Sequence, residues 1–493
     1  MNRPQQIQEI STETAWDIII AGGGATGLGA AVDAASRGYK TLLLEKFDFA
    51  KGTSSRSTKL VHGGVRYLEQ GNIKLVKEAL RERGWLLKNA PHLTHTMPFI
   101  IPAYGIVQKY YYGLGLKAYD FLSGKLSLGK TEFLTRQKTI DLLPTINASK
   151  LKGGVMYFDG QFDDARLAID LAKTAVQYGA AVCNYISVLK FIKSKQKICG
   201  LVAEDAVTGK TYELKAKAVI NATGVFADEL MQADDEKQPS IITPSQGIHL
   251  VVDKKFFPGN HALMIPKTDD KRVLFAVPWH NKVVLGTTDT PINGISEEPE
   301  ALDEEIDFVM HHANRYLSQT ITENDVKSIF AGLRPLVKQA GTKSTALLNR
   351  DHTIIVSKSN LVTITGGKWT TYRKMAEDAV DNAAFVAKLD KRECVTMTLL
   401  IGNCNAENSY PKRVSEESVL TYNEIKYFIE EEMAQTVEDI LSRRIRLLLL
   451  DAEAAISMAP HVAKEMAAVM NKDEIWIEKQ VKEFTAIAEQ YVL

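Results

Sequence analysis

The sequence carries no excess of either charge, because 60 lysines and arginines are balanced by 60 aspartates and glutamates. A nucleic-acid-binding chain usually has a basic surplus, so we expect no nucleic-acid partner. Cysteine is also scarce, and the cysteines show neither a CxxC pair nor the spacing of metal ligands. This usage is typical of reduced thiols in a cytosolic protein and predicts no bound metal. The cysteines are Cys183, Cys199, Cys394 and Cys404.

Long apolar runs are missing as well. No stretch reaches the roughly 20 apolar residues that a membrane-spanning helix needs, and residues 1–16 are too polar for a signal peptide. We therefore expect a cytoplasmic protein that meets a membrane, if at all, only at the inner face of the cell membrane. At 493 residues the chain is long enough for two or three domains.

Residues 17–45 form the most informative stretch of the chain. A buried strand leads into a glycine-rich turn and a helix, and a second strand ends in an acid about twenty residues later. Gly22 permits the tight turn, Gly24 lets the backbone approach a pyrophosphate, and Gly27 lets the helix pack against the strand. All parts of a dinucleotide-binding βαβ unit are therefore present.

The start of this helix and the end of the second strand complete the expected site. Ala25 and Thr26 lie in the first turn, where N–H groups and the positive end of the helix dipole attract phosphate. Glu45 is positioned to accept hydrogen bonds from the hydroxyls of an adenosine ribose. The motif alone also fits a non-catalytic redox sensor that binds a dinucleotide, so the function depends on the motifs that follow.

Hydrophobic periodicity beyond this unit predicts an α/β chain. The stretch 240–340 is rich in strand patterns and predicts an antiparallel sheet in a second domain, whereas residues after about 387 are helical in pattern. The predicted helices are 74–90, 163–178, 302–317, 414–433, 437–458 and 460–470. The predicted strands include 155–160, 183–193, 200–206, 211–217, 218–224, 248–252, 272–278 and 282–286.

Residues 99–130 combine aromatic side chains and lysines with a single acid, Asp120. This mixture is typical of an amphipathic segment at a membrane interface. A core helix with solvated lysines explains it equally well.

Five further runs, together with the glycine turn, carry a resemblance to a known family. They are 53–69, 221–224, 286–289, 332–336 and 366–374. In this order they resemble the FAD-dependent glycerol-3-phosphate dehydrogenases, within the glutathione-reductase-like flavoproteins. The runs SSRSTKLVHGGVRYLE and GGKWTTYRK are far more specific than the glycine turn, and the resemblance extends into the C-terminal helices.

The resemblance implies an α/β fold of three parts: a Rossmann-type FAD-binding domain, an antiparallel-sheet substrate domain and a C-terminal helical cap. The expected FAD-binding domain is discontinuous. We expect residues 15–75, 150–235 and 345–386 in the first part, 76–149 and 236–344 in the second, and 387–493 in the third.

The same resemblance implies an FAD site built from distant parts of the chain. Hydroxyl groups in residues 53–58 would hold the pyrophosphate and the ribityl chain, and His62 with the two glycines after it would lie against the isoalloxazine ring. A second glycine pair, before a helix at 369–384, repeats the anion-binding arrangement. The expected FAD contacts are Gly22, Gly24, Ala25, Thr26, Gly27, Glu45, Thr53, Ser54, Ser55, Ser57, Thr58, Leu60, His62, Gly63, Gly64, Val188, Ala222, Thr223, Gly224, Gly286, Asp289, Gly367, Lys368, Trp369 and Thr370.

The implied substrate is an anion, which several basic residues in these motifs could hold. Arginine grips a phosphate through two parallel hydrogen bonds, and an arginine in an apolar context, such as Arg334, needs an anion nearby. The expected substrate-binding residues are Arg66, Tyr67, Arg334, Arg350 and Lys368.

The expected catalytic residues are His62, His249 and Arg334. His249 stands in an apolar strand, where a satisfied core histidine is the plainer explanation, but the resemblance brings both histidines near the reacting carbon. Either imidazole can take a hydroxyl proton near neutral pH. The sequence leaves the choice between them open.

The implied reaction is the oxidation of sn-glycerol 3-phosphate to dihydroxyacetone phosphate by hydride transfer to flavin N5. The expected electron acceptor is a quinone, as in membrane-associated relatives, and an oxidase that uses oxygen is the alternative. An FAD-dependent amine or 2-hydroxy-acid oxidase of the same fold is a further alternative, although a carboxylate needs only one arginine. A homodimer and a peripheral membrane contact stay open.

Overall fold

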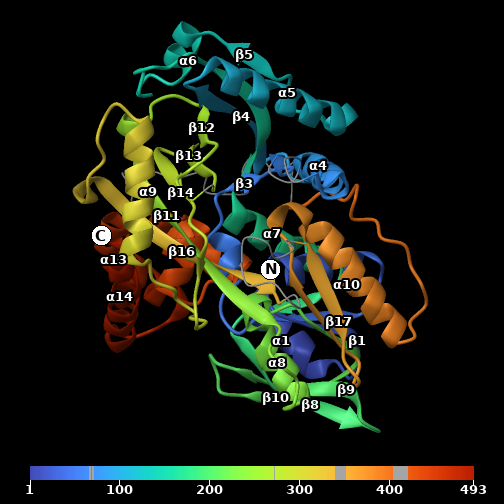
Figure 1. Cartoon of the computed structure of the whole chain (residues 1–493). Helices are drawn as coiled ribbons and strands as arrows, with labels where there is room; N and C mark the ends of the chain where they lie inside the picture. Colours follow the sequence, from blue (N-terminus) through green and yellow to red (C-terminus); the bar gives the residue numbers. More distant parts are fainter. Residues whose placement is uncertain (66–67, 69–70, 271, 339–350, 403–419) are drawn as a thin grey trace.

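Two β-sheets and a group of C-terminal helices make up the protein (Figure 1). The computed structural model describes residues 1–493 except 66–67, 69–70, 271, 339–350 and 403–419. In the view of Figure 1 the first sheet lies in the lower half, the second lies above it, and the last helices lie at the left.

The first sheet has the strand order β17-β18-β10-β1-β2-β7. All of these strands run parallel to their neighbours except β17 at the edge. Helices α2, α7 and α10 form one continuous apolar core with one face, while α1, β8 and β9 cover the other. The bounds are α1 Arg3–Thr12, β1 Trp16–Ala21, α2 Ala25–Ser36, β2 Thr41–Leu44, α7 Asp164–Gln177, β7 Ala181–Cys183, β8 Ile186–Ser194, β9 Lys197–Asp205, β10 Thr211–Asn221, β17 His352–Val356, β18 Leu361–Gly366 and α10 Tyr372–Val386.

The second sheet has the strand order β15-β11-β14-β13-β12-β4-β6-β3, with β16 paired to β11 and β5 to β6. Its pairs are antiparallel except for β12 with β4. The strands are β3 Leu60–Val61, β4 Thr94–Ala103, β5 Glu132–Leu134, β6 Gly153–Phe162, β11 Ile242–Asp253, β12 Ala262–Ile265, β13 Leu274–Trp279, β14 Lys282–Gly286, β15 Thr290–Pro291 and β16 Val326–Val337. The helices beside this sheet are α4 Ile73–Asn89, α5 Ile106–Ser123, α6 Arg136–Leu142 and α9 Asp303–Tyr316.

Strand β11 is buried on both faces, because its alternate side chains enter two different cores. Ile248 and Leu250 pack with α9 on one side. Val251 packs on the other side with Phe330 of β16 and with the C-terminal helices. His249 has the same parity as Val251, so it faces the side of the sheet that the C-terminal helices partly cover.

The C-terminal helices pack on this face and are joined to the first sheet by buried charges. Arg443 and Arg444 bind Asp48, which follows β2, and Arg166 of α7 binds Glu432 through two hydrogen bonds of 2.7 Å. The elements are α11 Tyr422–Glu432, a π-helical turn Asp439–Arg444, α12 Leu447–Leu450, α13 Ala452–Met470 and α14 Glu474–Ala488.

The predicted elements agree with the structure over much of the chain, with several differences. The predicted strand 183–193 is divided between β7 and β8, and the predicted helix 437–458 is divided among the π-helical turn, α12 and α13. The predicted strands 211–217 and 218–224 form one strand, β10, and α1 and α14 were not predicted. The predicted break before Pro460 is wrong, because α13 continues through this proline and is held by a buried apolar face. Part of the predicted helix 414–433 lies outside the described residues.

Sheet membership also differs from the expected division of the chain. Strands β3 and β6 fall within stretches expected in the FAD-binding part, yet both pair within the second sheet. Among the described helices, none combines the length and the apolar character needed to cross a membrane.

Candidate functional site

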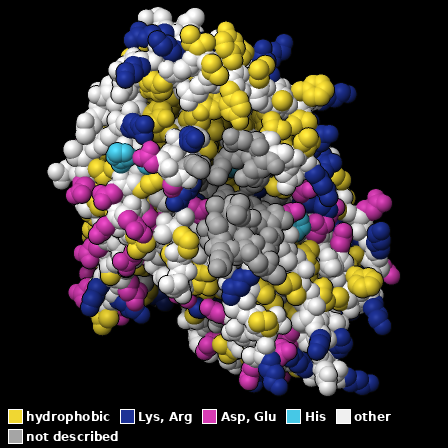
Figure 2. Space-filling model, viewed as in Figure 1, with side chains coloured by type: hydrophobic (Ala, Val, Ile, Leu, Met, Phe, Trp, Pro, Cys, Tyr) yellow, Lys and Arg dark blue, Asp and Glu magenta, His cyan; other side chains and the backbone are white. Residues whose placement is uncertain are grey.

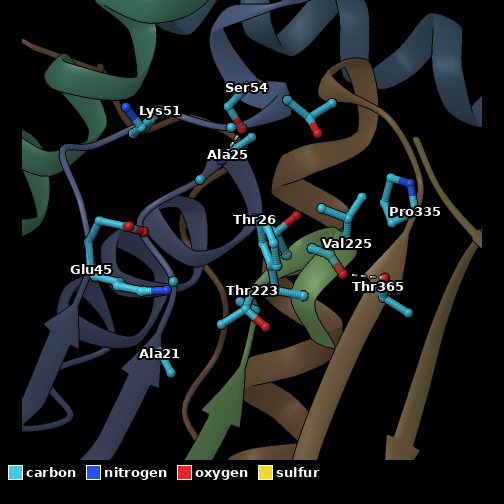
Figure 3. Close-up of a pocket in the computed structure, with 18 of the residues that line it drawn as sticks. Ala21, Ala25, Thr26, Glu45, Lys51, Ser54, Thr223, Val225, Pro335 and Thr365 are labelled. Carbon is cyan, nitrogen blue, oxygen red and sulfur yellow. Dashed lines mark hydrogen bonds between the residues drawn. The ribbon is translucent and has the colours of Figure 1, made fainter. Parts of the chain in front are cut away.

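A cavity of about 270 Å³ lies at the carboxyl ends of β1, β10 and β18, beside the start of α2 (Figure 3). Open α/β sheets bind ligands at this edge. Pro335 of β16 forms part of the opposite wall, so both sheets contribute to the cavity. Of the predicted FAD contacts, those lining it are Gly22, Gly24, Ala25, Thr26, Glu45, Thr53, Ser54, Val188, Ala222, Thr223, Gly224, Gly367, Lys368 and Trp369.

The start of α2 has the properties of a phosphate site. Its N-cap residue is Gly24, which has no side chain to cap the helix, and among the described residues the one N–H of its first turn bonded to a side chain is that of Ala25, which donates to Ser54 Oγ at 2.9 Å. Added Cβ atoms at Gly22 and Gly27 would collide with the backbone of Ala222 and of Gly22, respectively. The glycines therefore allow a close approach of backbone to backbone that leaves the helix end open to an anion.

Glu45 lies at the other side of this turn and lines the same cavity. Its carboxylate accepts hydrogen bonds from the N–H groups of Gly23 at 2.5 Å and Phe47 at 2.8 Å. Burial raises the pKa of Glu45, while these two N–H groups oppose the shift. Apolar side chains complete this end, and they are Ile186, Val188, Phe226 and Leu230.

These groups fit an extended dinucleotide such as FAD. A helix start with glycine at its N-cap suits the pyrophosphate, a carboxylate after the second strand suits a ribose, and an apolar wall suits an adenine. Thr53 and Ser54 line the same cavity as Lys368 and Trp369. The residues present therefore match the group that the sequence predicts.

Residues 53–64, here called the 53–64 loop, connect this cavity to the second sheet. Thr53 Oγ1 donates to the carbonyl of Leu333 in β16 at 2.5 Å. Ser57 donates to Asp164, and buried Lys59 donates to Asp164 at 2.8 Å and to the carbonyl of Ser55 at 2.6 Å. Burial lowers the pKa of Lys59, while Asp164 opposes the shift.

His249 contacts this loop from β11. Its Nε2 lies 2.8 Å from Thr58 Oγ1, and its ring stacks on Phe330 with centroids 4.8 Å apart. An added Cβ at Gly286 would collide with the imidazole, so this glycine makes room for it. Burial lowers the pKa of His249 well below its usual value, and the positive charges of Lys59 and Arg334 add to this effect. The imidazole is therefore neutral near pH 7.

Arg334 lies on the same sheet face as His249. It is paired in register with Ser245, and its guanidinium lies over Gly247, where an added Cβ would collide with it. The guanidinium donates to the carbonyls of Thr288 at 2.8 Å and Gln246 at 3.2 Å, and lies 3.4 Å from Asp289. Arg334 was expected to need an anion nearby, and the carboxylate of Asp289 is such an anion within the protein.

The second glycine turn, before α10, joins the same region. Trp369 Nε1 donates to the carbonyl of Ser54 at 2.9 Å, and Thr370 Oγ1 lies 3.4 Å from the carbonyl of His62. An added Cβ at Gly367 would collide with Met375. The two glycine turns and the 53–64 loop therefore meet around one cavity.

Other predicted residues lie away from the cavity wall. Thr58 and Gly286 contact His249, Asp289 contacts Arg334 and Ser245, and Ser57 contacts Asp164. The other predicted FAD contacts that do not line the cavity are Gly27, Ser55, Leu60, His62, Gly63, Gly64 and Thr370. The predicted substrate-binding residues Arg66, Tyr67 and Arg350 lie outside the described residues.

Several residues of this region were not predicted from the sequence. Lys59 stands inside the SSRSTK run, and its fully buried position depends on Asp164, more than a hundred residues away. The cluster of Asp48, Arg443 and Arg444 is equally non-local. The one feature of the sequence that could have indicated this cluster is the pair of arginines, Arg443 and Arg444, shortly before the apolar run at 447–450.

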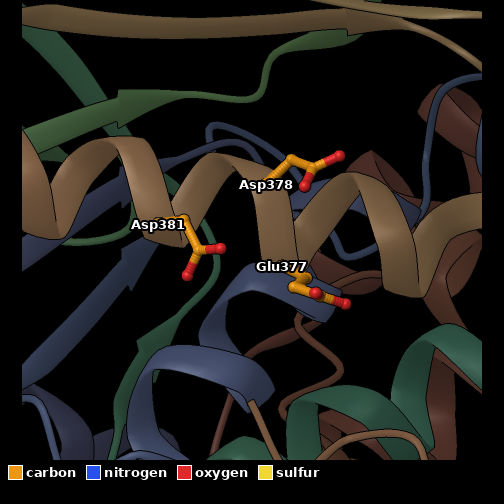
Figure 4. Close-up of side chains that lie close together, drawn as sticks. All are labelled: Glu377, Asp378 and Asp381. Atoms are coloured by element: carbon orange, nitrogen blue, oxygen red, sulfur yellow. The ribbon is translucent and has the colours of Figure 1, made fainter. Parts of the chain in front are cut away.

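Three acids on α10 come close enough together to hold a metal ion, Glu377, Asp378 and Asp381 (Figure 4). Each carboxylate instead pairs with a basic side chain. Glu377 and Asp378 lie 2.7 Å from Arg373 and Lys374, and Asp381 lies 2.5 Å from Arg37. We therefore interpret this cluster as ion pairs between α10 and its neighbours.

Comparisons with known proteins agree with this geometry. Residues 17–373 match the family described as FAD dependent oxidoreductase, and residues 359–476 match the C-terminal domain of alpha-glycerophosphate oxidase. The mitochondrial glycerol-3-phosphate dehydrogenase of Mesocricetus auratus is 37% identical over 96% of this chain and 73% of its own length.

Two solved structures are similar over most of their length. The glycerol-3-phosphate dehydrogenase from Bacillus halodurans, complexed with FAD, has a TM-score of 0.79 and 30% identity, and the match covers 99% of this chain and 97% of that one. The L-alpha-glycerophosphate oxidase from Mycoplasma pneumoniae shares the fold, with a TM-score of 0.59 and 18% identity over 77% of this chain and 97% of that one. The chain described here therefore belongs to the family of FAD-dependent glycerol-3-phosphate dehydrogenases.

Proposed function

We propose that this protein uses FAD to oxidise sn-glycerol 3-phosphate to dihydroxyacetone phosphate. The observation that carries the proposal is the placement of His249 and Arg334 on one face of the second sheet. His249 contacts Thr58 of the 53–64 loop, and Pro335, the residue after Arg334, lines the FAD cavity. A neutral base and a fixed cation thus lie beside the cofactor cavity.

Bound FAD would accept the two electrons as a hydride, and the protein would supply binding, alignment and proton handling. The start of α2, Glu45 and the hydroxyls of Thr53 and Ser54 are the residues that would hold FAD. Gly367, Lys368 and Trp369 would hold it from the opposite side. His62, Gly63 and Gly64 follow in the same loop and would face the ring system.

His249 is our candidate for the base that removes the hydroxyl proton. A base must be unprotonated, and burial beside Lys59 and Arg334 keeps this imidazole neutral. Its Nδ1 has no hydrogen-bond partner among the described residues, whereas Nε2 faces Thr58. His62, in the 53–64 loop, is the second candidate, and Thr370 of the turn before α10 binds its backbone carbonyl.

Arg334 is our candidate for holding the substrate phosphate, with Lys368, Arg66, Tyr67 and Arg350 as further expected contacts. Its guanidinium lies over Gly247, two residues from His249. Two residues of a strand span about 7 Å, which suits a phosphate and a secondary alcohol on one three-carbon substrate. Four hydrogen bonds to described residues, one of which is also the ion pair with Asp289, fix the orientation of the guanidinium before the substrate binds.

We further propose a division of labour between three parts of the chain. Residues 15–75, 150–235 and 345–386 would bind FAD, 76–149 and 236–344 the substrate, and 387–493 would form a cap. We assign β3 and β6 to the substrate-binding part, because they pair within its sheet.

For the electron acceptor we propose a quinone, reached at a membrane surface through α5. Exposed apolar side chains project from this helix, among them Val107 at 84% exposure and Phe121 at 86%. Hydrophobic side chains gather on the upper part of the face shown in Figure 2, where Figure 1 draws α5. Lys109, Lys117 and Lys125 lie nearby in sequence and would favour an anionic lipid surface.

Anaerobic bleaching of the flavin absorbance tests the proposed reaction. The purified holoprotein should bleach with sn-glycerol 3-phosphate but not with glycerol, lactate or glycine. Bleaching by lactate or glycine alone would favour the carboxylate-substrate oxidases instead. Reoxidation by a soluble quinone faster than by oxygen would support the quinone acceptor, and the reverse order would make the protein an oxidase.

A further inference from the structure

The buried carboxylate of Asp159, on β6, connects the 53–64 loop to α4 and α5, two helices beside the second sheet. Asp159 Oδ1 lies 2.8 Å from Arg83 Nη1 of α4 and 3.3 Å from the N–H of Gly63. Its Oδ2 accepts a hydrogen bond of 2.9 Å from the hydroxyl of Tyr119 on α5. We propose that Asp159, Arg83 and Tyr119 form a tie that positions the backbone at His62–Gly64 for the oxidation reaction.

The tie is buried and electrically balanced. Asp159, Arg83 and Tyr119 are each almost completely buried, and the guanidinium lies over the tyrosine ring at 5.9 Å from its centroid. Burial raises the pKa of Tyr119 well above its usual value, and the neighbouring carboxylate adds to this effect. The phenol therefore stays protonated and donates to Asp159 at any working pH.

Packing supports the hydrogen bonds of the tie. An added Cβ at Gly63 would collide with Leu80 of α4 and with the hydroxyl of Tyr119. The 53–64 loop is therefore in direct contact with α4 and α5, and the glycine at position 63 allows this contact. Since Gly63 has no side chain, its position depends on its N–H bond to Asp159 and on this packing.

The inference rests on the proposed function, because that function brings the His62–Gly64 backbone to the flavin ring. Reacting groups need support that keeps them within about 0.5 Å of the productive geometry. Tyr119 also belongs to α5, whose opposite side carries the exposed apolar residues. The tie thus connects the helix that we assign to the membrane surface with the loop at the flavin.

The test compares Tyr119→Phe with the matched control Tyr157→Phe. Tyr157 is equally buried on β6 and lies near Asp159, but its hydroxyl donates to Met264 Sδ at 3.2 Å and is not part of the hydrogen bonds to Asp159. Each variant removes one buried hydroxyl and keeps the ring. The measurements are the limiting rate of anaerobic flavin reduction, the substrate concentration at half-maximal rate, and the visible circular dichroism of the bound flavin.

We expect Tyr119→Phe to lower the limiting reduction rate about tenfold, the effect of losing one hydrogen bond to a charged group. The half-saturating substrate concentration should stay unchanged, and Tyr157→Phe should change neither quantity. If Tyr119→Phe reduces the flavin at the wild-type rate, or if both variants lose the same fraction of this rate, the proposed tie is wrong.

The dichroism separates this inference from the proposed function. If the wild-type holoprotein does not bleach with sn-glycerol 3-phosphate, the proposed function fails. The flavin dichroism then still decides the tie, because it reports the surroundings of the ring without any substrate. A spectrum altered in Tyr119→Phe but not in Tyr157→Phe supports the tie, and an unaltered spectrum contradicts it.

Discussion

Thr58 Oγ1 lies 2.8 Å from Nε2 of His249, and this contact joins the 53–64 loop to strand β11 of the second sheet. It holds the imidazole by one nitrogen while Phe330 stacks on its ring. The candidate base is therefore fixed in position by a residue of the 53–64 loop and a residue of β16.

Replacement of His249 tests its role as the base. His249→Asn should lower the rate of flavin reduction by about 100- to 10,000-fold, the usual contribution of a general base, while FAD stays bound. His312→Asn is a suitable control, because His312 is equally buried but lies on α9 and bonds to Phe308 and Asp269. If His62→Asn causes the larger loss, the base is His62 instead.

The depressed pKa of His249 predicts a pH-dependent stability. Below its usual value of about 6.5 the imidazole of the unfolded chain takes up a proton, whereas the buried imidazole does not. The neutral imidazole therefore contributes to the free energy of unfolding. This contribution is complete above about pH 6.5 and decreases as the pH falls, by up to about 1.4 kcal/mol per pH unit. The difference in thermal midpoint between the wild type and His249→Asn should therefore narrow from pH 7.5 to 5.5. A constant difference would mean that the imidazole protonates normally in the folded protein.

Arg334→Lys tests the phosphate assignment. Lysine keeps the charge but cannot make all the hydrogen bonds to Gln246, Thr287 and Thr288 that orient the guanidinium, so kcat/KM for sn-glycerol 3-phosphate should fall about 10- to 100-fold. The side chain is 24% exposed and paired with Asp289, so a folding defect is not expected to dominate. Arg315→Lys, an exposed arginine that pairs with Asp269 at 3.0 Å, is the control. An equal loss with a phosphate-free substrate analogue would show that Arg334 does not bind phosphate.

The membrane surface assigned to α5 is tested by cosedimentation with vesicles that contain anionic lipid. The double change Val107→Ser and Phe121→Ser should reduce binding about tenfold or more, because it removes two large apolar side chains from the interface. Phe385→Ser is the matched control, since Phe385 is 84% exposed but lies at the end of α10. Equal losses in both proteins would point to general surface hydrophobicity.

The glycine turn, Glu45 and the His249 strand could be predicted from sequence, because each depends on neighbours within one or two elements. The partner of Arg334 could not, since Asp289 reaches it only through the register of β11 with β16 and the turn after β14. The contacts of Asp159 could not be predicted either, because its partners Arg83 and Tyr119 lie 76 and 40 residues away along the chain. The path of α13 through Pro460 depends on burial of the whole helix rather than on the local residue.

The buried pair of Asp48 and Arg444 predicts how the C-terminal helices support the FAD cavity. Asp48 follows Glu45 closely in sequence, and Arg444 holds its two oxygens at 2.6 and 2.9 Å. Arg444→Met should destabilise the protein by about 3 kcal/mol, because it leaves a buried carboxylate with fewer partners, and it should speed the release of FAD.

The double variant Asp48→Asn with Arg444→Met distinguishes this pairing from loss of packing. Removing both charges should restore part of the thermal midpoint, because a buried charge without its partner is the main cost. Lys479→Met, in an exposed pair 3.7 Å from Glu483 on α14, should leave both the midpoint and FAD release unchanged. Additive losses in the double variant would mean that Asp48 and Arg444 act independently, and that the C-terminal helices do not support the turn after Glu45 through this pair.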